Sequence, residues 1–426
     1  MDQHKYIEKI KEKIKEKIKS PLFTFIFANA MYSFSTWLIS ILSPFLLEKD
    51  TYERFIYSFQ TMLYVASVST LGFVPTLLRY YKYDKQKYQD YFLYCISVIY
   101  ILLLIVGFFP KNPLSCFLHI EDYSFSAHLV FYLSSITILL FVFNRALLTA
   151  EAKYMVLVKT ILSICVIRVL AMLFIKAVNI TSDAMVMFCI CVIPMMWEFL
   201  IYGKNVAKIK WFFNYREFKS FIVFAFMTSI IGIIFVTSGR LYLLELKSNN
   251  SFNVPIISYV YGMLGIVTIF NTTFSSYFIG KLDARNLHQI DAYIYKIKLF
   301  TIPYLLFVVL LTCGIFMFVY LCYPYNSSIA AIYAAVASVS SSLIAYVGLL
   351  TLLTKTFNLL KMQLCVNVTC LIVTFLYVRY IPCIDSIYAY VLLVIIQLVF
   401  ELFVAIFVLY KIKRVKQIQE KSLHGK

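Results

Sequence analysis

Long apolar runs alternate with short polar segments along the whole chain. Each run has about 20 residues or more, the length that a helix needs to cross the hydrocarbon core of a bilayer. The runs are continuous, as in spanning helices, and lack the alternation of spanning strands. The pattern predicts an all-α polytopic membrane protein with twelve transmembrane helices. Their expected ranges are 21–47, 55–80, 91–110, 126–148, 156–177, 184–203, 219–244, 254–280, 297–322, 329–353, 362–380 and 387–410.

The polar segments differ in charge, and this difference predicts the topology. Cytoplasmic loops of membrane proteins collect Lys and Arg. Of the 39 basic residues, seven lie in 1–20, five in 204–219 and six after 410. The loops on the opposite, outer side of the membrane hold very few. One span more or fewer would put a basic loop on the outer side. We therefore expect both termini in the cytoplasm.

Composition agrees with this class and excludes others. The chain is 62% hydrophobic and 14% charged, with a mean hydropathy of +0.83, against roughly 45–50% apolar residues in soluble domains. The net charge of +18 lies in short loops beside the spans. Topology and attraction to anionic headgroups account for it, so no nucleic-acid partner is expected. The ten cysteines are scattered, without a CxxC pair or a His/Cys cluster, so we predict neither a metal site nor a cofactor.

The first 20 residues form a separate basic segment. Their isoleucines at 7, 10, 14 and 18 fall on one face of a helix, with Lys and Glu on the rest. This predicts an amphipathic helix on the inner leaflet, with a coiled-coil or regulatory role as the alternative. No cleavage site follows the first apolar run, so that run is expected to remain as an anchor.

Short matches at a near-constant offset indicate a duplication. Leu-Leu-Thr with a Lys four positions after the Thr occurs at 147–153 and at 349–355, an offset of 202 (349 minus 147). Phe-Ala and Leu-Leu-Glu bracket both 27–48 and 224–245, and Met-Leu recurs at 62–63 and 263–264. Six helices per repeat give both halves the same orientation, an arrangement in which transporters bind cargo between the halves. The predicted divisions are a basic amphipathic segment 1–20, an N-terminal half 21–203, a cytoplasmic linker 204–218, a C-terminal half 219–410 and a basic cytoplasmic tail 411–426.

Four stretches carry a family resemblance. Residues 51–81 combine an aromatic-rich start, a mid-helix Leu-Gly and an Arg near the cytoplasmic end; the others are 144–170, 221–246 and the YPYNSS at 323–328. Together they resemble the polysaccharide exporters of the multidrug/oligosaccharidyl-lipid/polysaccharide (MOP) superfamily, the Wzx-type flippases of O-antigen and capsule repeat units. The chain departs from that pattern at Gly239, where an Asp commonly precedes the Arg, and it lacks the usual Gly near the start of helix two.

This resemblance implies a flippase that moves undecaprenyl-diphosphate-linked oligosaccharides across the bacterial cytoplasmic (inner) membrane for surface polysaccharide biosynthesis. The implied mechanism is alternating access coupled to H⁺ or Na⁺, and no P-loop or other nucleotide motif is present. The implied partners are the lipid-diphosphate-linked oligosaccharide, membrane lipids and other membrane proteins of polysaccharide assembly.

An ionisable side chain within a span costs free energy to bury in the bilayer, so each one calls for a structural or functional explanation. From the helical rise, Arg168 lies about 13 Å and Glu198 about 9 Å from the inner boundary. They stand on consecutive antiparallel helices, so an ion pair between them is geometrically possible. Such a pair is either structural only, or Arg168 binds an anionic cargo and Glu198 pairs with it between transport cycles. Glu401 lies about 15 Å deep with no Lys or Arg in its own span. It is either a coupling carboxylate or a neutral structural one.

Other polar side chains are weaker candidates for substrate binding. Arg240 lies about 31 Å beyond Lys219, which favours an interfacial anchor over a cargo role. Arg79 and Arg145 lie near cytoplasmic helix ends, as anchors or as first contacts for a lipid diphosphate. Asn29 and Asn271 suit sugar hydroxyls or contacts between helices. The candidate substrate-binding residues are thus Arg168, Arg145, Arg79, Arg240, Asn29 and Asn271, and the candidate ion-coupling residues are Glu198 and Glu401.

Two other functions compete with the flippase. A membrane polymerase or glycosyltransferase would need a large outer catalytic loop, whereas the longest one here is 111–125, so no enzyme is expected. A drug or small-solute antiporter is the stronger alternative. The loop after helix two and the short linker do not fit the major facilitator type, but the multidrug branch of the same superfamily stays open.

Overall fold

The computed structural model describes residues 21–424 except 71, 203–213, 266, 268–281, 283–285, 358 and 381–385. The predicted amphipathic segment 1–20, most of the linker and Asn271 lie outside the described residues.

The described N-terminal part contains six helical spans. Their elements are α2 (Pro21–Leu46), α3 (Lys49–Thr70) with α4 (Phe73–Tyr80), α5 (Lys85–Gly107), α7 (Phe125–Ala150), α8 (Tyr154–Val178), and α9 (Asp183–Met187) continued by the π-helical η1 (Phe188–Val192) and α10 (Ile193–Tyr202). The short helix α6 (Pro113–Phe117) lies in the outer loop between α5 and α7.

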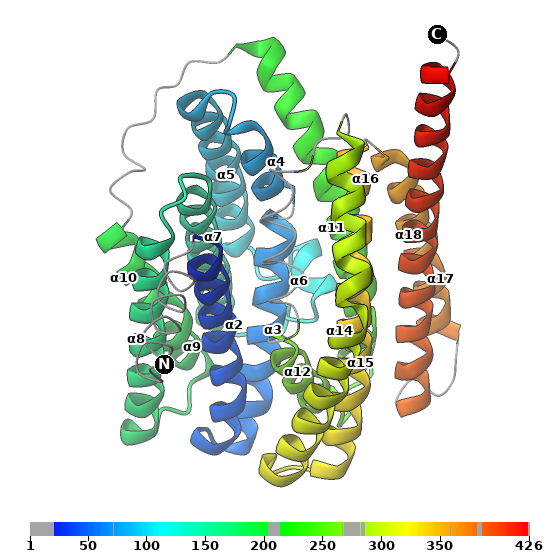
Figure 1. Ribbon diagram of the computed structural model, residues 1–426. Helices are drawn as coiled ribbons and strands as arrows, with labels where there is room; N and C mark the ends of the chain where they lie inside the picture. Colours follow the sequence, from blue (N-terminus) through cyan, green and yellow to red (C-terminus); the bar gives the residue numbers. More distant parts are fainter. Residues whose placement is uncertain are drawn as a thin grey trace, which may run out of the picture.

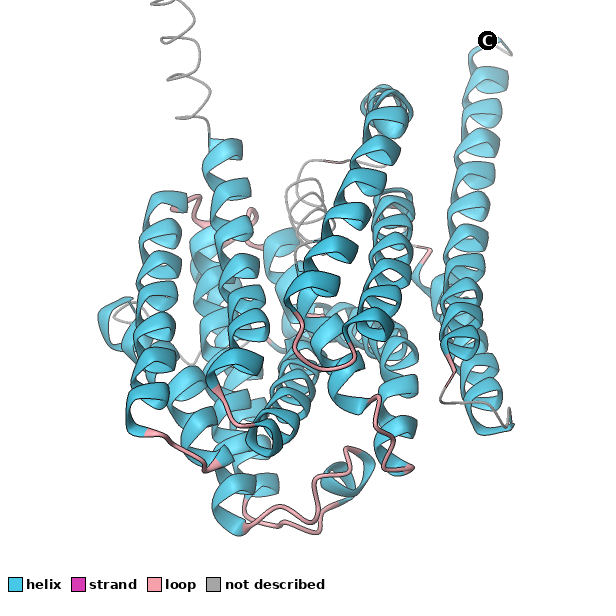
Figure 2. Cartoon of the chain, turned by 90° about the horizontal axis from the view of Figure 1, so that it is seen from below, coloured by secondary structure: helices cyan, strands magenta, loops and turns pink. Residues whose placement is uncertain are grey.

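The described C-terminal part repeats the series. Its elements are α11 (Tyr215–Ser248), α12 (Val254–Met263), α14 (Leu287–Cys322), α15 (Ser327–Thr351) with α16 (Leu353–Thr356), α17 (Leu360–Tyr380) and α18 (Ile387–His424). Within the described ranges every element is a helix and no strand occurs, as Figure 2 shows.

The predicted fold class is confirmed. Among the described residues, nine helical segments are long and apolar enough to cross a membrane, and the apolar part of α2 and the helix α12 are shorter apolar segments. The sixth predicted span is the continuous run of α9, η1 and α10. A helix therefore occupies each of the twelve predicted positions, the eighth of them described only in its first part.

Several helices extend beyond their predicted ends, because hydropathy registers only the apolar portion of a helix. α5 begins at Lys85 rather than 91, and α14 begins at Leu287 rather than 297. Side-chain caps fix these polar starts: Asp84 accepts a hydrogen bond from the Lys87 amide and Asn286 accepts one from the Gln289 amide.

The two halves repeat the same packing. In each half the first helix packs on the fifth (α2 on α8, α11 on α17) and the second on the fourth (α3 on α7, α12 on α15). The third helix packs on the fourth (α5 on α7, α14 on α15), and the sixth packs on both the fourth and the fifth (α10 on α7 and α8, α18 on α15 and α17). Figure 1 shows the blue-to-green helices on one side and the green-to-red helices on the other. This repetition supports the duplication, while the exact division of the chain stays a prediction.

The halves meet through the first two helices of each. α12 packs on α2 and α3, and α11 packs on α3 and α4. Two glycines make this approach close: a Cβ on Gly262 would lie 2.0 Å from Ser40 Oγ, and a Cβ on Gly72 would lie 2.0 Å from the Ala225 carbonyl oxygen. The contact of α12 with α2 lies toward the outer ends of the helices, and that of α4 with α11 lies toward their cytoplasmic ends.

The repeated Leu-Leu-Thr–Lys segments occupy corresponding places in the two halves. α7 ends at Ala150 and α15 ends at Thr351, each directly before the loop that leads into the fifth helix of its half. In each segment the Thr hydroxyl donates to a carbonyl of its own helix, from Thr149 to Arg145 at 2.8 Å and from Thr351 to Gly348 at 3.2 Å. The segments therefore mark helix ends.

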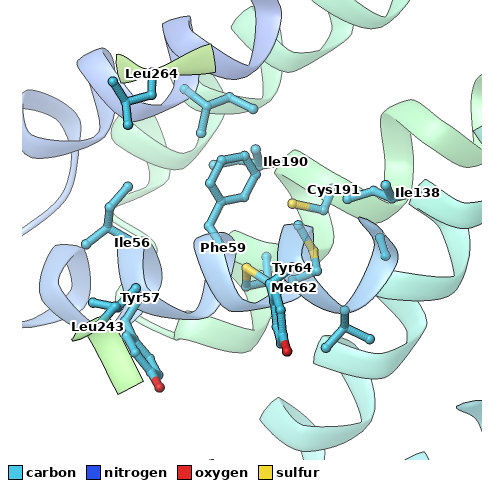
Figure 3. Packing of buried hydrophobic residues seen from close by; sticks show 14 of the residues in the cluster. Ile56, Tyr57, Phe59, Met62, Tyr64, Ile138, Ile190, Cys191, Leu243 and Leu264 are labelled. Carbon is cyan, nitrogen blue, oxygen red and sulfur yellow. The ribbon is translucent and has the colours of Figure 1, made fainter. Parts of the chain in front are cut away.

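Buried aromatic and aliphatic side chains form a core that extends through both halves. Figure 3 shows part of it around α3, where Phe59 projects to one side of the helix and Tyr57 and Tyr64 project to the other. A second, smaller cluster joins α14, α16 and α18 toward their cytoplasmic ends. The tyrosine side of α3 faces the seam between the halves.

Candidate functional site

Arg240 lies at the seam between the halves, in the outer part of α11. It stands eight residues before Ser248, about 12 Å from the end of the helix. Its guanidinium lies over the ring of Tyr261 at 4.4 Å from the centroid. Tyr57, Tyr64 and Tyr390 also lie close enough to interact with it electrostatically. We refer to Arg240 with Tyr57, Tyr64, Tyr261 and Tyr390 as the tyrosine cage.

The cage draws on both halves and its rings are fixed by hydrogen bonds. From α3, the Tyr57 hydroxyl donates to the Leu118 carbonyl at 2.7 Å and the Tyr64 hydroxyl lies 2.7 Å from Thr237 Oγ1. From α12, the Tyr261 hydroxyl donates to the Gly239 carbonyl at 2.6 Å. Tyr57 and Tyr64 are seven residues apart, so they share a face of the helix, and Figure 3 shows both on that face.

The role of Arg240, as an interfacial anchor or as a cargo residue, stays a prediction. Its Nη1 is buried and has no hydrogen-bond partner among the described residues. The helix that carries it, α11, has 34 residues, about 51 Å of helix, which exceeds the roughly 30 Å hydrocarbon core.

Glu401 lines a small enclosed cavity inside the C-terminal half. The cavity has a volume of about 10 Å³, close to the minimum for one water molecule. Its polar lining comes from three helices: Ser238 on α11, Asn367 on α17, and Gln397 with Glu401 on α18. Glu401 is 6% exposed, and no hydrogen bond or ion pair to its carboxylate occurs within the described ranges.

The chemistry of this lining suits a small hard cation or a proton. The Asn367 amide donates to the Ile231 carbonyl at 3.3 Å, and the Ser238 hydroxyl donates to the Ile234 carbonyl at 2.8 Å. The Asn367 amide and the Ser238 hydroxyl each donate one hydrogen bond to the backbone, and the oxygen atoms of both side chains can accept. Carboxylate, amide and hydroxyl oxygens are the ligands that hard cations prefer. No group of His, Cys, Asp and Glu able to hold a metal ion is found in the described part of the chain.

Gly239 connects the cavity to the tyrosine cage. A Cβ at this position would lie 3.4 Å from Gln397 Nε2. Gln397 therefore occupies the space beside the position where the resembling exporters commonly carry an Asp. Because Ser238 lines the cavity and Arg240 stands in the cage, adjacent residues of α11 serve both sites.

Glu198 lies in the N-terminal half and is 1% exposed. The Asn144 side-chain amide, from α7, donates to its Oε1. Its Oε2 is buried with no hydrogen-bond partner among the described residues, as is the hydroxyl of Tyr100, which interacts with Glu198 electrostatically. One carboxylate oxygen is therefore fixed to a neighbouring helix.

The ion pair that the sequence allows between Arg168 and Glu198 is not formed in the described structure. Arg168 is 2% exposed and its Nη1 donates to the Ser35 hydroxyl at 2.6 Å, toward α2, whereas Glu198 contacts α7. No salt bridge joins the two described side chains. They lie on antiparallel neighbours but on different faces. Arg168 Nε has no partner among the described residues, and its neighbour Cys191 belongs to the π-helical turn η1.

The remaining candidates make contacts with aromatic rings or lie outside the description. Arg145 lies over Tyr32 of α2 at 5.0 Å from the ring centroid. Arg79 lies over Phe224 at 4.5 Å and so joins α4 to α11 across the seam. The side chain of Asn29 is not described, so its role stays a prediction, as does that of Asn271.

Sequence reasoning missed the tyrosines of the cage and the amides Asn144, Asn367 and Gln397. A signal existed for the first group, since tyrosines seven residues apart at the polar start of a span share one face. Neutral amides inside apolar helices give a weaker signal, because they also serve as ordinary contacts between helices.

The arrangement described above is a bundle of apolar helices in two halves that repeat the same packing around a common seam. No protein-family model matches the sequence, and no curated protein matches it. Solved structures do match over almost their whole length. The eukaryotic MATE transporter AtDTX14 aligns with a TM-score of 0.68 at 12% identity, over 96% of this chain and 98% of that one.

Two further structures give the same result. A MATE transporter crystallised in the straight conformation aligns with a TM-score of 0.64 at 11% identity. A MOP superfamily transporter from Pyrococcus furiosus, for which a reversed polarity of the binding pocket suggests a different function, aligns with a TM-score of 0.62 at 13% identity. Each alignment covers 93% of this chain and 97% of the other. The chain thus has the same multi-pass fold as these transporters, and this is the fold that the sequence resemblance implies.

Proposed function

We propose that this protein is an ion-coupled exporter that carries a negatively charged amphipathic cargo between its two halves. The observation that carries the proposal is Arg240, a cation at the seam with a buried Nη1 that has no hydrogen-bond partner in the described part of the chain. A guanidinium is planar and forked, and it binds phosphate through paired hydrogen bonds. The tyrosines around it offer both apolar faces and hydroxyl groups.

The cargo that best fits this chemistry is an undecaprenyl-diphosphate-linked oligosaccharide at the bacterial inner membrane. Its diphosphate supplies the anion for Arg240, and its sugars supply hydroxyls for polar groups at the seam. The lipid tail would stay in the bilayer. Membrane proteins of polysaccharide assembly are then the expected partners.

Alternating access requires contacts between the halves that can break and re-form. At the outer ends, the hydroxyls of Tyr52 and Tyr323 lie 3.3 Å apart and the rings of Tyr259 and Tyr323 lie 4.4 Å apart. At the cytoplasmic ends, Tyr80 packs edge-on against Phe221 at 5.8 Å. Ring contacts of this kind are worth about 0.5–1.5 kcal/mol each beyond burial, so a modest difference in binding energy is enough to exchange them.

Coupling is assigned to the cavity at Glu401. A proton or a Na⁺ ion bound there would neutralise a carboxylate that has no ion pair within the described ranges. Gln397 lines the same cavity and packs beside Gly239. Binding or release of the ion would therefore alter the contact of Gln397 with α11 at Gly239, one residue away from Arg240. The oxygen-rich lining suits either ion, so both H⁺ and Na⁺ stay candidates for the coupling ion.

A drug or small-solute antiporter is the second candidate. The fold comparison favours it over the flippase, since the similar solved structures include MATE transporters. The cation Arg240 in the tyrosine cage favours an anionic cargo. A multidrug transporter for cationic compounds would not need a buried cation at this place.

Reconstitution separates the two candidates. Purified protein in liposomes receives a short-chain fluorescent lipid diphosphate oligosaccharide, and its transfer is followed under an imposed H⁺ or Na⁺ gradient. Transfer by the wild type that is lost in Arg240→Ala supports the flippase. Gradient-driven uptake of cationic dyes, without lipid transfer, supports the antiporter and refutes the anionic cargo.

A further inference from the structure

A basic cavity of about 270 Å³ lies between α14 and α18 toward their cytoplasmic ends. It is separate from the cavity at Glu401, since Lys413 stands 12 residues beyond Glu401 along α18, about 18 Å. The side chains that matter here are Asp291, Ile294, Lys298, Ile412, Lys413 and Lys416. We refer to it as the inner basic cavity.

The cavity stands where apolar surface gives way to charge. On α14, the exposed apolar residues Leu299, Phe300 and Ile302 come directly after Lys298, and the exposed Tyr295 lines the cavity itself. On α18, the exposed apolar residues Ile406 and Tyr410 come directly before the charged end of the helix. Exposed apolar side chains on a spanning helix face lipid, so this level is that of the inner-leaflet headgroups.

The charges of the cavity are unbalanced. Lys416 pairs with Asp291, whereas no carboxylate lies within ion-pair distance of Lys298 or Lys413 in the part of the chain that the structure describes. Three lysines and one carboxylate leave a net charge of two (3 − 1 = +2) in one concave site. The negative surface potential of an inner leaflet attracts such basic sites.

The floor of the cavity is rigid and apolar. Ile290 and Ile297 of α14, Leu353 of α16, and Val404 and Val408 of α18 form a buried cluster beneath it. α14 and α18 each pack on α15, and the Asp291–Lys416 pair joins them directly at the rim. An occupant of the cavity would touch both helices and hold them together.

We propose that the inner basic cavity binds the headgroup of an anionic phospholipid from the inner leaflet. The phosphate lies between Lys298 and Lys413, and the acyl chains lie along the exposed apolar faces of α14 and α18. Lys is a point-charge ligand for phosphate and needs no fixed geometry. The continuity of charged cavity and lipid-facing surface selects a phospholipid over a soluble anion. Because α18 also carries Glu401, the lipid would stabilise the helix that lines the coupling cavity.

The test measures lipid binding by the purified full chain in neutral detergent, independently of any transport. Phosphatidylglycerol, phosphatidylcholine or inorganic phosphate is titrated while thermal unfolding is followed, and bound lipids are counted by native mass spectrometry. We expect phosphatidylglycerol to raise the unfolding midpoint by several degrees and to remain bound, with an effect that weakens as salt increases.

The variant Lys298→Gln/Lys413→Gln should bind phosphatidylglycerol at least tenfold more weakly. The matched control is Lys82→Gln/Lys85→Gln, which removes two exposed lysines from the cytoplasmic side of the other half and should bind as the wild type does. Asp291→Asn, which removes the carboxylate from the cavity, should bind more tightly. An unchanged circular dichroism spectrum and elution profile show that each variant folds.

Three results would overturn the proposal. Equal stabilisation by phosphatidylcholine would mean that the headgroup charge is not recognised. Equal stabilisation by inorganic phosphate would make this a site for soluble anions. Loss of binding in the control variant, or wild-type binding in Lys298→Gln/Lys413→Gln, would place the lipid elsewhere.

Discussion

Replacement of Gly72 by Ala tests whether the two halves are closely packed on the cytoplasmic side. Gly72 lies directly before α4 and has φ −92° and ψ −26°, a right-handed conformation that alanine adopts freely. Any effect of the added methyl group must therefore come from the space around it. That space belongs to α11: the Cβ would lie 2.0 Å from the Ala225 carbonyl oxygen and 2.1 Å from Ser229 Oγ.

The size of the effect follows from these contacts. Forcing an extra methyl group into a packed site costs about 1–3 kcal/mol, and because Gly72 is the N-cap of α4 rather than a helix-interior residue, alanine gains no helix propensity there. The Ser229 hydroxyl can rotate, but the Ala225 oxygen and the Ser229 amide nitrogen, at 2.5 Å, are backbone atoms. α4 must therefore separate from α11, or the protein must lose stability by roughly 1–3 kcal/mol.

Gly314 provides the matched control. It lies in α14, and a Cβ there would meet nothing within 4 Å. Gly314→Ala should therefore be neutral or stabilise the protein by up to about 1 kcal/mol through helix propensity. Both variants change one glycine to alanine in the same fold, so the difference between them isolates the contact at the seam.

Two measurements follow the two possible responses. Thermal unfolding in detergent should show a lower midpoint for Gly72→Ala than for Gly314→Ala. A distance measured between labels at Lys82 and Lys219, both exposed beside the seam, should increase if the halves separate instead. If Gly72→Ala matches Gly314→Ala in both the midpoint and the distance, the close approach of α4 and α11 does not exist.

The remaining predictions concern the polar groups inside the halves. Arg240→Ala should lower transport of a lipid diphosphate about 10- to 100-fold, the loss of one or two charged hydrogen bonds, with partial recovery in Arg240→Lys; liposome assays with wild-type rates in Arg240→Ala would remove this residue from the cargo site. Glu401→Gln should fold normally yet transport at a rate that no longer responds to an ion gradient, and an unchanged response would exclude it from coupling. Asn144→Ala should destabilise the protein by about 1–3 kcal/mol by leaving the Glu198 carboxylate without its donor, and Glu198→Gln in the same background should recover part of this; an unchanged unfolding midpoint in Asn144→Ala would show that the contact contributes nothing.

The twelve helices could be predicted because membrane insertion depends on the sum of apolar residues over a span, a quantity that the sequence contains. The polar extensions could not, since they depend on caps such as Asp84 and Asn286. The repeated Leu-Leu-Thr–Lys matches pointed to the duplication, and the repeated helix packing agrees with it.

The partners of the buried charges were less predictable, because depth along a helix says nothing about direction around it. Depth placed Arg168 and Glu198 on adjacent helices, but one side chain faces Ser35 and the other faces Asn144. The direction of each side chain depends on geometry that only the packed helices determine.

The two glutamates show how the halves have diverged in their use of the same helix. Glu198 and Glu401 both stand on the last helix of a half, yet Glu198 is bound to Asn144, while Glu401 faces a cavity lined by polar groups of three helices. Reversible ion binding needs space and uncommitted oxygen atoms, and only the second site has both among the described residues. The same α11 that lines this cavity carries Arg240 to the seam. We therefore infer that α11 joins ion coupling in the C-terminal half to cargo binding at the seam, and that the buried polar contacts of the N-terminal half keep that half rigid.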